Sequence, residues 1–245
     1  MQHGFGAHSE KANGFVSFLN VQSTKYRQAG ESYMNKKPAK PIPESHYDRF
    51  KYRLEEISGE WAERNITIFL LDIATGYRIQ DIIHLTISDI QTALQQGYFE
   101  IQEKKQYNAW KTHMRKSPKS SKKIPEKRKH DIVPQLEVIL KKYIKNKKKS
   151  EYAFPSQKGS GSKHISEKAY SDILKKVADD NEINLKNITG HSLRKTYARR
   201  LFEETNNLEY VRIALGHLSV EVTKRYLGLD DDVKESAAKI AGRKL

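Results

Sequence analysis

The spacing of apolar residues from residue 44 onward limits most strongly what this chain can fold into. From Tyr47 to Ile57, apolar side chains recur at steps of three and four, which predicts an amphipathic helix that ends at Gly59. Similar segments follow along most of the chain. The further predicted helices lie at about 61–74, from 77 onward, and at 135–149, 165–180, 190–204, 207–215, 219–227 and 230–243.

One short region breaks the helical pattern. Residues 86–90 and 98–103 alternate between apolar and polar side chains; 98–103 predicts a strand, and 131–134 is its expected partner. The intervening residues 106–130 carry nine Lys or Arg and one acid, which predicts a long, mobile, basic hairpin loop. The expected fold class is therefore mainly α with a small antiparallel β-sheet (α+β).

The first 43 residues differ in composition from the rest. They contain four glycines, and three prolines cluster at 38, 41 and 43. We therefore expect residues 1–43 to form a basic flexible arm and linker, and residues 44–245 to form the folded domain. The first ten residues lack the basic-then-apolar pattern of a signal peptide, and no apolar run is long enough to span a bilayer.

Charge and cysteine content narrow the function classes. The chain has 45 Lys and Arg against 30 Asp and Glu, a formal net charge of +15, which favours a polyanionic partner such as nucleic acid. A ribosome-associated protein or a merely lysine-rich surface would give the same charge. The chain has no cysteine, which excludes a disulfide scaffold, a Cys-ligated zinc site and a thiol nucleophile.

Two motifs combine arginine with a second polar group one helical turn away. In TGYRIQD, Asp81 follows Arg78 by three residues, so its carboxylate could hold the guanidinium ready to grip a phosphate. In GHSLRKTYA, His191 precedes Arg194 by three, and this pair could supply proton transfer and charge stabilisation. An ordinary surface ion pair and a solvated basic helix face explain the same two spacings.

Two further motifs carry a tyrosine and lysines. In LGHLSVEVTKRY, Tyr226 follows His217 by nine residues; a tyrosine is a nucleophile only where a basic pocket stabilises its phenolate, and packing is the commoner role. In EIQEKK, Lys104 and Lys105 stand at the end of the predicted strand, and Lys111 follows in the basic loop. The chain shows no HExxH zinc motif and no GxxxxGK[ST] phosphate loop, so chemistry on phosphate would rest on side chains alone.

Taken in this order and spacing, TGYRIQD, EIQEKK, GHSLRKTYA and LGHLSVEVTKRY resemble the tyrosine recombinase (phage integrase) family over roughly residues 45–243. The resemblance implies that Arg78 and Arg194 clamp the scissile phosphate and that Tyr226 is the nucleophile. It implies that His191 is a general acid or base and that His217 donates a hydrogen bond to the phosphate. Asp81 would orient Arg78.

The family also has a catalytic lysine on its β-hairpin, which protonates the leaving 5′-oxygen. Counting four residues on from Ile101 favours Lys105, with Lys104 and Lys111 as alternatives. The basic loop is expected to bind DNA. The residues expected to do so are Lys111, Arg115, Lys116, Lys119, Lys122, Lys123, Lys127 and Arg128.

The resemblance implies a site-specific DNA recombinase that cuts and rejoins double-stranded DNA through a 3′-phosphotyrosine, without metal or ATP, for integration, excision or inversion of a mobile element. A type IB topoisomerase-like enzyme and a non-catalytic DNA-binding protein are the alternatives. A tetramer on DNA, acting in the cytoplasm on nucleoid or host DNA, is expected.

Family members usually carry a core-binding domain of about a hundred residues, and this chain is expected to be a compact member without it, or to need an accessory protein. The helix at 230–243 is expected to dock on a neighbouring protomer or to fold back on its own domain.

Overall fold

The computed structural model describes residues 37–158, 162–229, 236–237 and 240–242. The chain divides into two compact units, Met1–Pro38 and Ala39–Leu245. The larger unit begins before the predicted boundary at residue 44, because Ile42 is buried in its core and donates its backbone N–H to Thr196 Oγ1 at 2.9 Å. The predicted helix at 230–243 falls largely outside the described residues; those parts of it that are described, 236–237 and 240–242, are helical.

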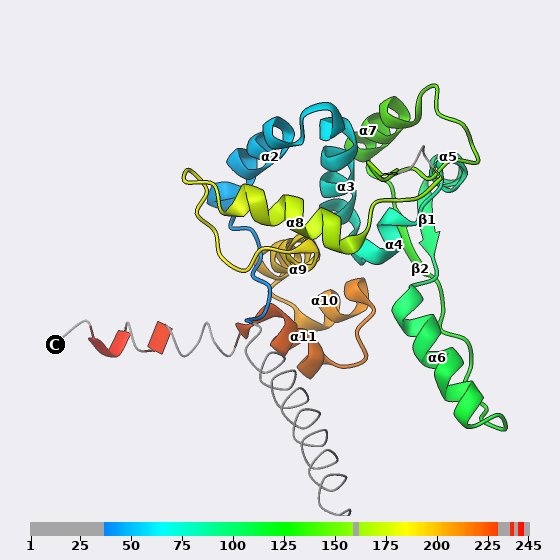
Figure 1. The fold of residues 1–245 in the computed structure, drawn as a ribbon. Helices are drawn as coiled ribbons and strands as arrows, with labels where there is room; N and C mark the ends of the chain where they lie inside the picture. Colours follow the sequence, from blue (N-terminus) through cyan, green and yellow to red (C-terminus); the bar gives the residue numbers. More distant parts are fainter. Residues whose placement is uncertain (1–36, 159–161, 230–235, 238–239, 243–245) are drawn as a thin grey trace, which may run out of the picture. The chain divides into compact units, whose positions relative to one another are not determined.

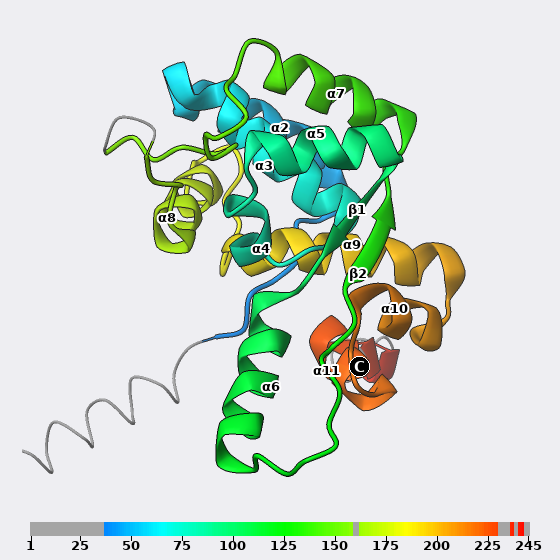
Figure 2. The same cartoon turned by 90° about the vertical axis from the view of Figure 1, so that its right-hand side faces the viewer.

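The larger unit is mostly helical, as the apolar spacing predicts (Figures 1 and 2). Its first helices are α2 Glu44–Ser58, α3 Ala62–Thr75, α4 Ile79–Ile83, α5 Ile87–Gln96 and α6 Lys104–Lys116, with a 3₁₀ turn at Gly59–Trp61. Its later helices are α7 Pro134–Ile144, α8 Glu167–Ala178, α9 Gly190–Thr205, α10 Leu208–Leu215 and α11 Val220–Leu227. Within the described residues, no helix is both long and apolar enough to cross a membrane.

The core forms around α3, which packs against α2, α7 and α9. Ile68 and Phe69 of this helix are fully buried, and each such side chain contributes about 1.5–3 kcal/mol by leaving water. A second, smaller apolar cluster joins α9, α10 and α11 through Ala198, Val211 and Leu227. This second cluster matters for function, because α9 carries His191 and Arg194, α11 carries Tyr226, and His217 lies in the turn between α10 and α11.

The sheet consists of β1, Tyr98–Ile101, and β2, Arg128–Asp131, paired antiparallel with Tyr98 opposite Asp131. The predicted partner strand at 131–134 was therefore displaced by three residues. The reason is Pro134: it has no backbone N–H to donate to a sheet, and it begins α7 instead. The apolar–polar alternation at residues 86–90 marks the start of a helix rather than a strand, because Thr86 forms a capping box with Asp89 and starts α5.

The prediction of a mobile loop over 106–130 was wrong in its first half. Residues 104–116 form α6, and only residues 117–127 return to β2 as an irregular segment. Lys105 therefore lies in the first turn of a helix rather than on a strand. Figures 1 and 2 show α6 running away from the sheet, beyond the rest of the domain.

Candidate active site

The turn between α3 and α4 starts the site. Gly76 has φ +56°, and a Cβ at this position would collide with the Tyr197 ring, so the turn requires glycine. The Gly76 carbonyl accepts a hydrogen bond from Arg194 Nη1 at 2.7 Å. The same short turn that ends α3 thus presents Arg78 at the start of α4 and fixes Arg194 on α9.

Arg194 is 2 % exposed and ties three elements together. Besides Gly76, its Nη1 donates to Glu103 Oε1 at 3.0 Å, and its Nη2 donates to the Leu215 carbonyl at the end of α10 at 2.7 Å. These bonds hold the guanidinium in one orientation. An arginine fixed in this way can bind a phosphate without first losing side-chain freedom.

Glu103 is a central member of the site that the sequence analysis did not single out. It is 2 % exposed and forms ion pairs with Arg78, with Arg194 and, at 3.6 Å, with Arg128 Nε. Burial alone would raise the pKa of Glu103, but the positive charges of Arg194, Arg78 and Arg128 lower it below its usual value. The carboxylate is therefore ionised at neutral pH and organises three guanidinium groups.

A period-two signal could have found Glu103. Phe99 is buried on β1, and continuing the alternation past Ile101 places Glu103 on the same inward face. A carboxylate on an inward face of a basic chain indicates an ion-paired group.

The prediction that Asp81 orients Arg78 does not fit this geometry. Asp81 Oδ1 instead accepts a hydrogen bond from the backbone N–H of Lys104 at 2.9 Å. Its Oδ2 is buried and has no hydrogen-bond partner among the described residues. The pKa of Asp81 is raised, chiefly by burial. Glu103, 22 residues further along the chain than Asp81, is the carboxylate that pairs with Arg78.

A pocket of about 230 Å³ brings together four of the predicted catalytic residues. It is lined by Arg78 from the start of α4, Lys105 from α6, and His191 and Arg194 from α9, together with Ile79, Gln80, Glu167 and Gly190. Of the three candidate lysines, Lys105 is the one that lines this pocket. Lys111 lies six residues further along α6, roughly 9 Å away along the helix axis.

His191 lies in the first turn of α9, which Thr189 caps. Its pKa is lowered, first by burial and then by Lys105, Arg194 and Arg78, although Glu167 opposes the shift. The imidazole is therefore neutral at pH 7 and can accept a proton.

His217 and Tyr226 meet beside Arg194 rather than in the pocket. Their rings stand edge to face with centroids 5.1 Å apart, and His217 Nδ1 lies 3.0 Å from Thr223 Oγ1. Burial, together with Arg194 and Arg78, lowers the pKa of His217 to about 4. Burial raises the pKa of Tyr226 to about 12, although the charge of Arg194 acts to lower it.

The Tyr226 hydroxyl is buried beside Arg194 and has no well-formed hydrogen bond to a residue of the described ranges. Leaving such a group without a partner costs roughly 1–3 kcal/mol. Of the residues around it, Arg194 also lines the pocket, and so connects the tyrosine to the residues gathered there.

Arg128 departs from its prediction as a DNA-binding loop residue. Its side chain is 11 % exposed, its Nη1 donates to the carbonyls of Thr75 and Ala214, and its guanidinium lies 4.0 Å from the centre of the Tyr77 ring. Arg128 therefore supports the site from inside. The other predicted DNA-binding residues are exposed: Lys111, Arg115, Lys116, Lys119, Lys122, Lys123 and Lys127.

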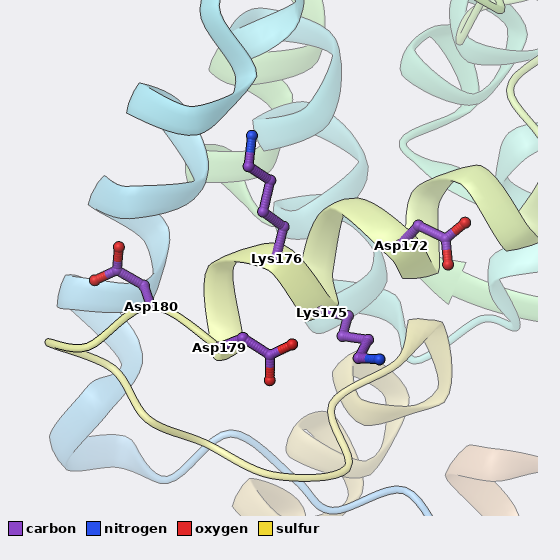
Figure 3. A pocket seen from close by; sticks show the side chains of 5 residues that line it. All are labelled: Asp172, Lys175, Lys176, Asp179 and Asp180. Atoms are coloured by element: carbon purple, nitrogen blue, oxygen red, sulfur yellow. The ribbon is translucent and has the colours of Figure 1, made fainter.

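A second pocket lies at the end of α8 and shares no residue with the site (Figure 3). It is open to solvent, and its lining combines two lysines with three carboxylates: Lys175, Lys176, Asp172, Asp179 and Asp180. Asp180 is already paired with Arg53. This mixture of signs favours no anionic ligand.

Comparison with known proteins shows to which family this chain belongs. The model of the phage integrase family matches residues 47–232. The chain belongs to the phage integrase family. The predicted family is thereby confirmed, and its relatives are named as integrases or recombinases.

Two relatives illustrate how much of the family is represented. The chain is 29% identical over 180 residues to "Probable integrase/recombinase YoeC" of Bacillus subtilis, which covers 74% of this chain and 86% of that protein. It is 24% identical over 175 residues to "Tyrosine recombinase XerS" of Streptococcus sanguinis, covering 71% of this chain and 44% of that protein. The chain thus spans less than half the length of this second relative.

Solved structures of the family share the fold. XerH site-specific recombinase bound to difH, in a pre-cleavage complex, matches with a TM-score of 0.55 and 20% identity, over 78% of this chain and 50% of that one. The Tn1549 transposon integrase in complex with a circular intermediate DNA matches with a TM-score of 0.56 and 18% identity, over 78% and 62%. Both likenesses establish the fold of this phage integrase family domain.

Proposed function

We propose that this chain is a site-specific DNA recombinase in which Tyr226 attacks a DNA phosphate held by Arg78 and Arg194. The convergence of Arg78, Lys105, His191 and Arg194 on one pocket carries the proposal, because these residues come from three separate helices. Two arginines fixed before substrate arrives suit the charge that develops on a phosphate under attack.

The proposed step conserves the energy of the phosphodiester bond. The Tyr226 oxygen forms a bond to phosphorus, and the bond from phosphorus to the 5′-oxygen breaks. Because the pKa of Tyr226 is about 12, its proton must be removed, and neutral His191 is the base that we assign to it. Lys105 then gives a proton to the leaving 5′-oxygen, and the new 5′-hydroxyl can attack a second 3′-phosphotyrosine to rejoin the strands.

His217 suits a hydrogen-bonding role better than a charged one. With a pKa of about 4 it is neutral at pH 7, so one ring N–H can donate to a non-bridging phosphate oxygen without adding charge. Tyr226 does not line the pocket, so we expect DNA binding to bring its hydroxyl to the phosphate. The surroundings of the hydroxyl support this, because that movement breaks no well-formed hydrogen bond to a described residue, and Arg194 beside it also lines the pocket.

The partners of the proposed enzyme are double-stranded DNA sites and further copies of the chain. We propose a tetramer assembled on DNA, with an accessory protein as a further partner. Integration, excision or inversion of a mobile element is the proposed outcome, and nucleoid or host DNA is the proposed place of action.

Covalent trapping tests the proposal. Nicked duplex fragments from the DNA that encodes the chain lose the 5′-hydroxyl strand after attack, which leaves protein attached to DNA. We expect a denaturation-resistant band with the wild type and with Tyr210→Phe, a control at an exposed tyrosine on α10. Tyr226→Phe should give none. A band that survives Tyr226→Phe would refute the assignment of the nucleophile.

A further inference from the structure

The segment between the two strands, residues 104–127, forms a separate structural feature. From here on we call these residues the arm; they are distinct from the arm and linker predicted at residues 1–43. None of the residues of its helix, α6, is buried, and α6 points away from the sheet in both views (Figures 1 and 2). From residue 104 to residue 125 the arm contains eight Lys or Arg and no Asp or Glu. A helix of 13 residues that packs on so little is marginal unless other contacts hold it.

Besides the bond from the Lys104 backbone N–H to Asp81, the side-chain hydrogen bonds that hold α6 lie on one side of it. At its start, Gln106 Nε2 donates to Glu103 Oε2 at 2.9 Å and to the Gly216 carbonyl at 3.1 Å. Further along, Trp110 Nε1 donates to the carbonyl of Lys122 at 2.8 Å, and His113 Nε2 lies 3.0 Å from Ser120 Oγ. Residues 106, 110 and 113 share one face at helical spacing, so this face secures the arm to the site and to its own returning segment.

The basic residues occupy the other side. At about 100° per residue, all five Lys and Arg of α6 fall within about 140° of arc, and Gln106, Trp110 and His113 fall outside it. The five are Lys104, Lys105, Lys111, Arg115 and Lys116. Among the described residues, no ion pair is formed by the three at the far end, 111, 115 and 116, which are exposed.

This basic face begins at the pocket. Lys105, in the first turn of α6, lines the pocket with Arg78 and Arg194, and Lys116 ends the helix 11 residues later. At about 1.5 Å per residue the face extends roughly 17 Å from the site, which is about five base pairs of duplex at 3.4 Å each.

We propose that the arm is a DNA-backbone clamp, whose basic face follows the phosphates of the duplex to about five base pairs on one side of the scissile phosphate. The proposal rests on the proposed function for the position of the scissile phosphate. It assigns contact to Lys111, Arg115 and Lys116, and it assigns a supporting role to Trp110, which keeps the returning segment off the basic face.

A salt titration tests the contact without requiring cleavage. The probe is a fluorescent 30-base-pair duplex of mixed sequence, with affinity measured by anisotropy against potassium chloride. Each phosphate contact contributes about 0.9 to the slope of log affinity against log salt, so we expect Lys111→Gln/Arg115→Gln/Lys116→Gln to flatten it by about 2.7. Because these side chains are exposed and form no ion pair with the described residues, the triple variant should unfold at the wild-type temperature.

The matched control removes the same charge elsewhere. Lys145→Gln/Lys148→Gln/Lys149→Gln changes three exposed lysines after α7, at the end of the domain opposite α6 in Figures 1 and 2. We expect this control to flatten the slope by less than about 0.9, the contribution of one phosphate contact. Equal slopes for the two triple variants would overturn the arm proposal, and a larger effect of the control would place the duplex against α7 instead.

A second test locates the arm on DNA. Since the chain has no cysteine, Lys116→Cys carries a unique thiol to which an iron chelate can be attached. On covalently trapped DNA, we expect strand scission about five base pairs from the attachment point, and none from a chelate at Lys145→Cys. Trapping without such scission would refute the arm proposal and leave the proposed chemistry intact. If the salt titration shows binding through the arm but no DNA is trapped, the proposed chemistry would be refuted and the arm proposal would stand.

Discussion

Replacing Glu103 by glutamine removes a buried negative charge from between Arg78, Arg194 and Arg128 while keeping the shape of the side chain. Removing one partner of a buried ion pair costs about 3–5 kcal/mol, because the remaining charges stay buried without compensation. Glutamine retains an oxygen that can accept a hydrogen bond from Arg194, so we take the lower end, about 3 kcal/mol. For a domain of this size, each kcal/mol shifts Tm by about 2–4 °C, which gives an expected fall of about 6–12 °C.

Thermal unfolding followed by circular dichroism measures this loss. Glu100→Gln is the matched control, because Glu100 lies on β1 too but pairs only at the surface, with Lys127 at 3.3 Å, where a pair contributes about 1 kcal/mol or less. The pH dependence follows from the lowered pKa of Glu103. Its contribution to stability is present above the unfolded carboxyl pKa of about 4.3 and is lost as pH falls through the lower folded value. The Tm values of the wild type and of Glu103→Gln should therefore converge in acid.

Adding sulfate provides a second test in the same experiment. In Glu103→Gln an anion can replace the missing carboxylate between the guanidinium groups, so sulfate should raise its Tm more than that of the wild type at equal ionic strength. The reasoning would be refuted if Glu103→Gln and Glu100→Gln lost the same Tm, or if sulfate raised both equally. Either result would mean that Glu103 does not hold the three charges together.

Three further results are expected. Gly76→Ala should lower Tm by several degrees and abolish trapping, because a Cβ there meets the Tyr197 ring; Gly97→Ala, which shares the positive φ (+79°) but has open space around its Cβ, is the control and should lower Tm less and retain trapping. In a pH–rate profile, cleavage should persist below pH 6.5 and fall only as His191 protonates at its lowered pKa; a fall centred above 6.5 would contradict its burial. Lys105→Ala should cleave slowly on ordinary DNA but at near wild-type rate on a 5′-bridging phosphorothiolate, whose thiolate leaves without a proton, and Lys104→Ala should need no such rescue.

Local patterns in the sequence predicted the helices and most of the site. Apolar spacing located α2, α3 and α7 to α11, because each buries one face in one of the two apolar clusters. Arg78, His191 and Arg194 were identified by their spacing and order, and the structure brings these three together in one pocket. Lys105 joins them there, and the other two candidates, His217 and Tyr226, lie beside Arg194.

What the sequence did not reveal depends on contacts between distant residues. Arg128 resembles a surface charge in the sequence. The alternation past Ile101 places Glu103 inward, but only the packing of β1, β2 and α9 brings the two charges together. The strand register depended on Pro134 starting a helix. The arm was predicted as a loop because α6 has no apolar stripe facing the core, and its stability comes instead from bonds such as that from Trp110 to residue 122.

The identity of the attached residue tests the central claim most directly. Protein trapped on nicked DNA can be digested with nuclease and protease, and the peptide that carries the residual nucleotide identified by mass spectrometry. The account predicts a nucleotide 3′-phosphate on the Tyr226 hydroxyl. A nucleotide on another residue, or a link through a 5′-phosphate, would contradict it.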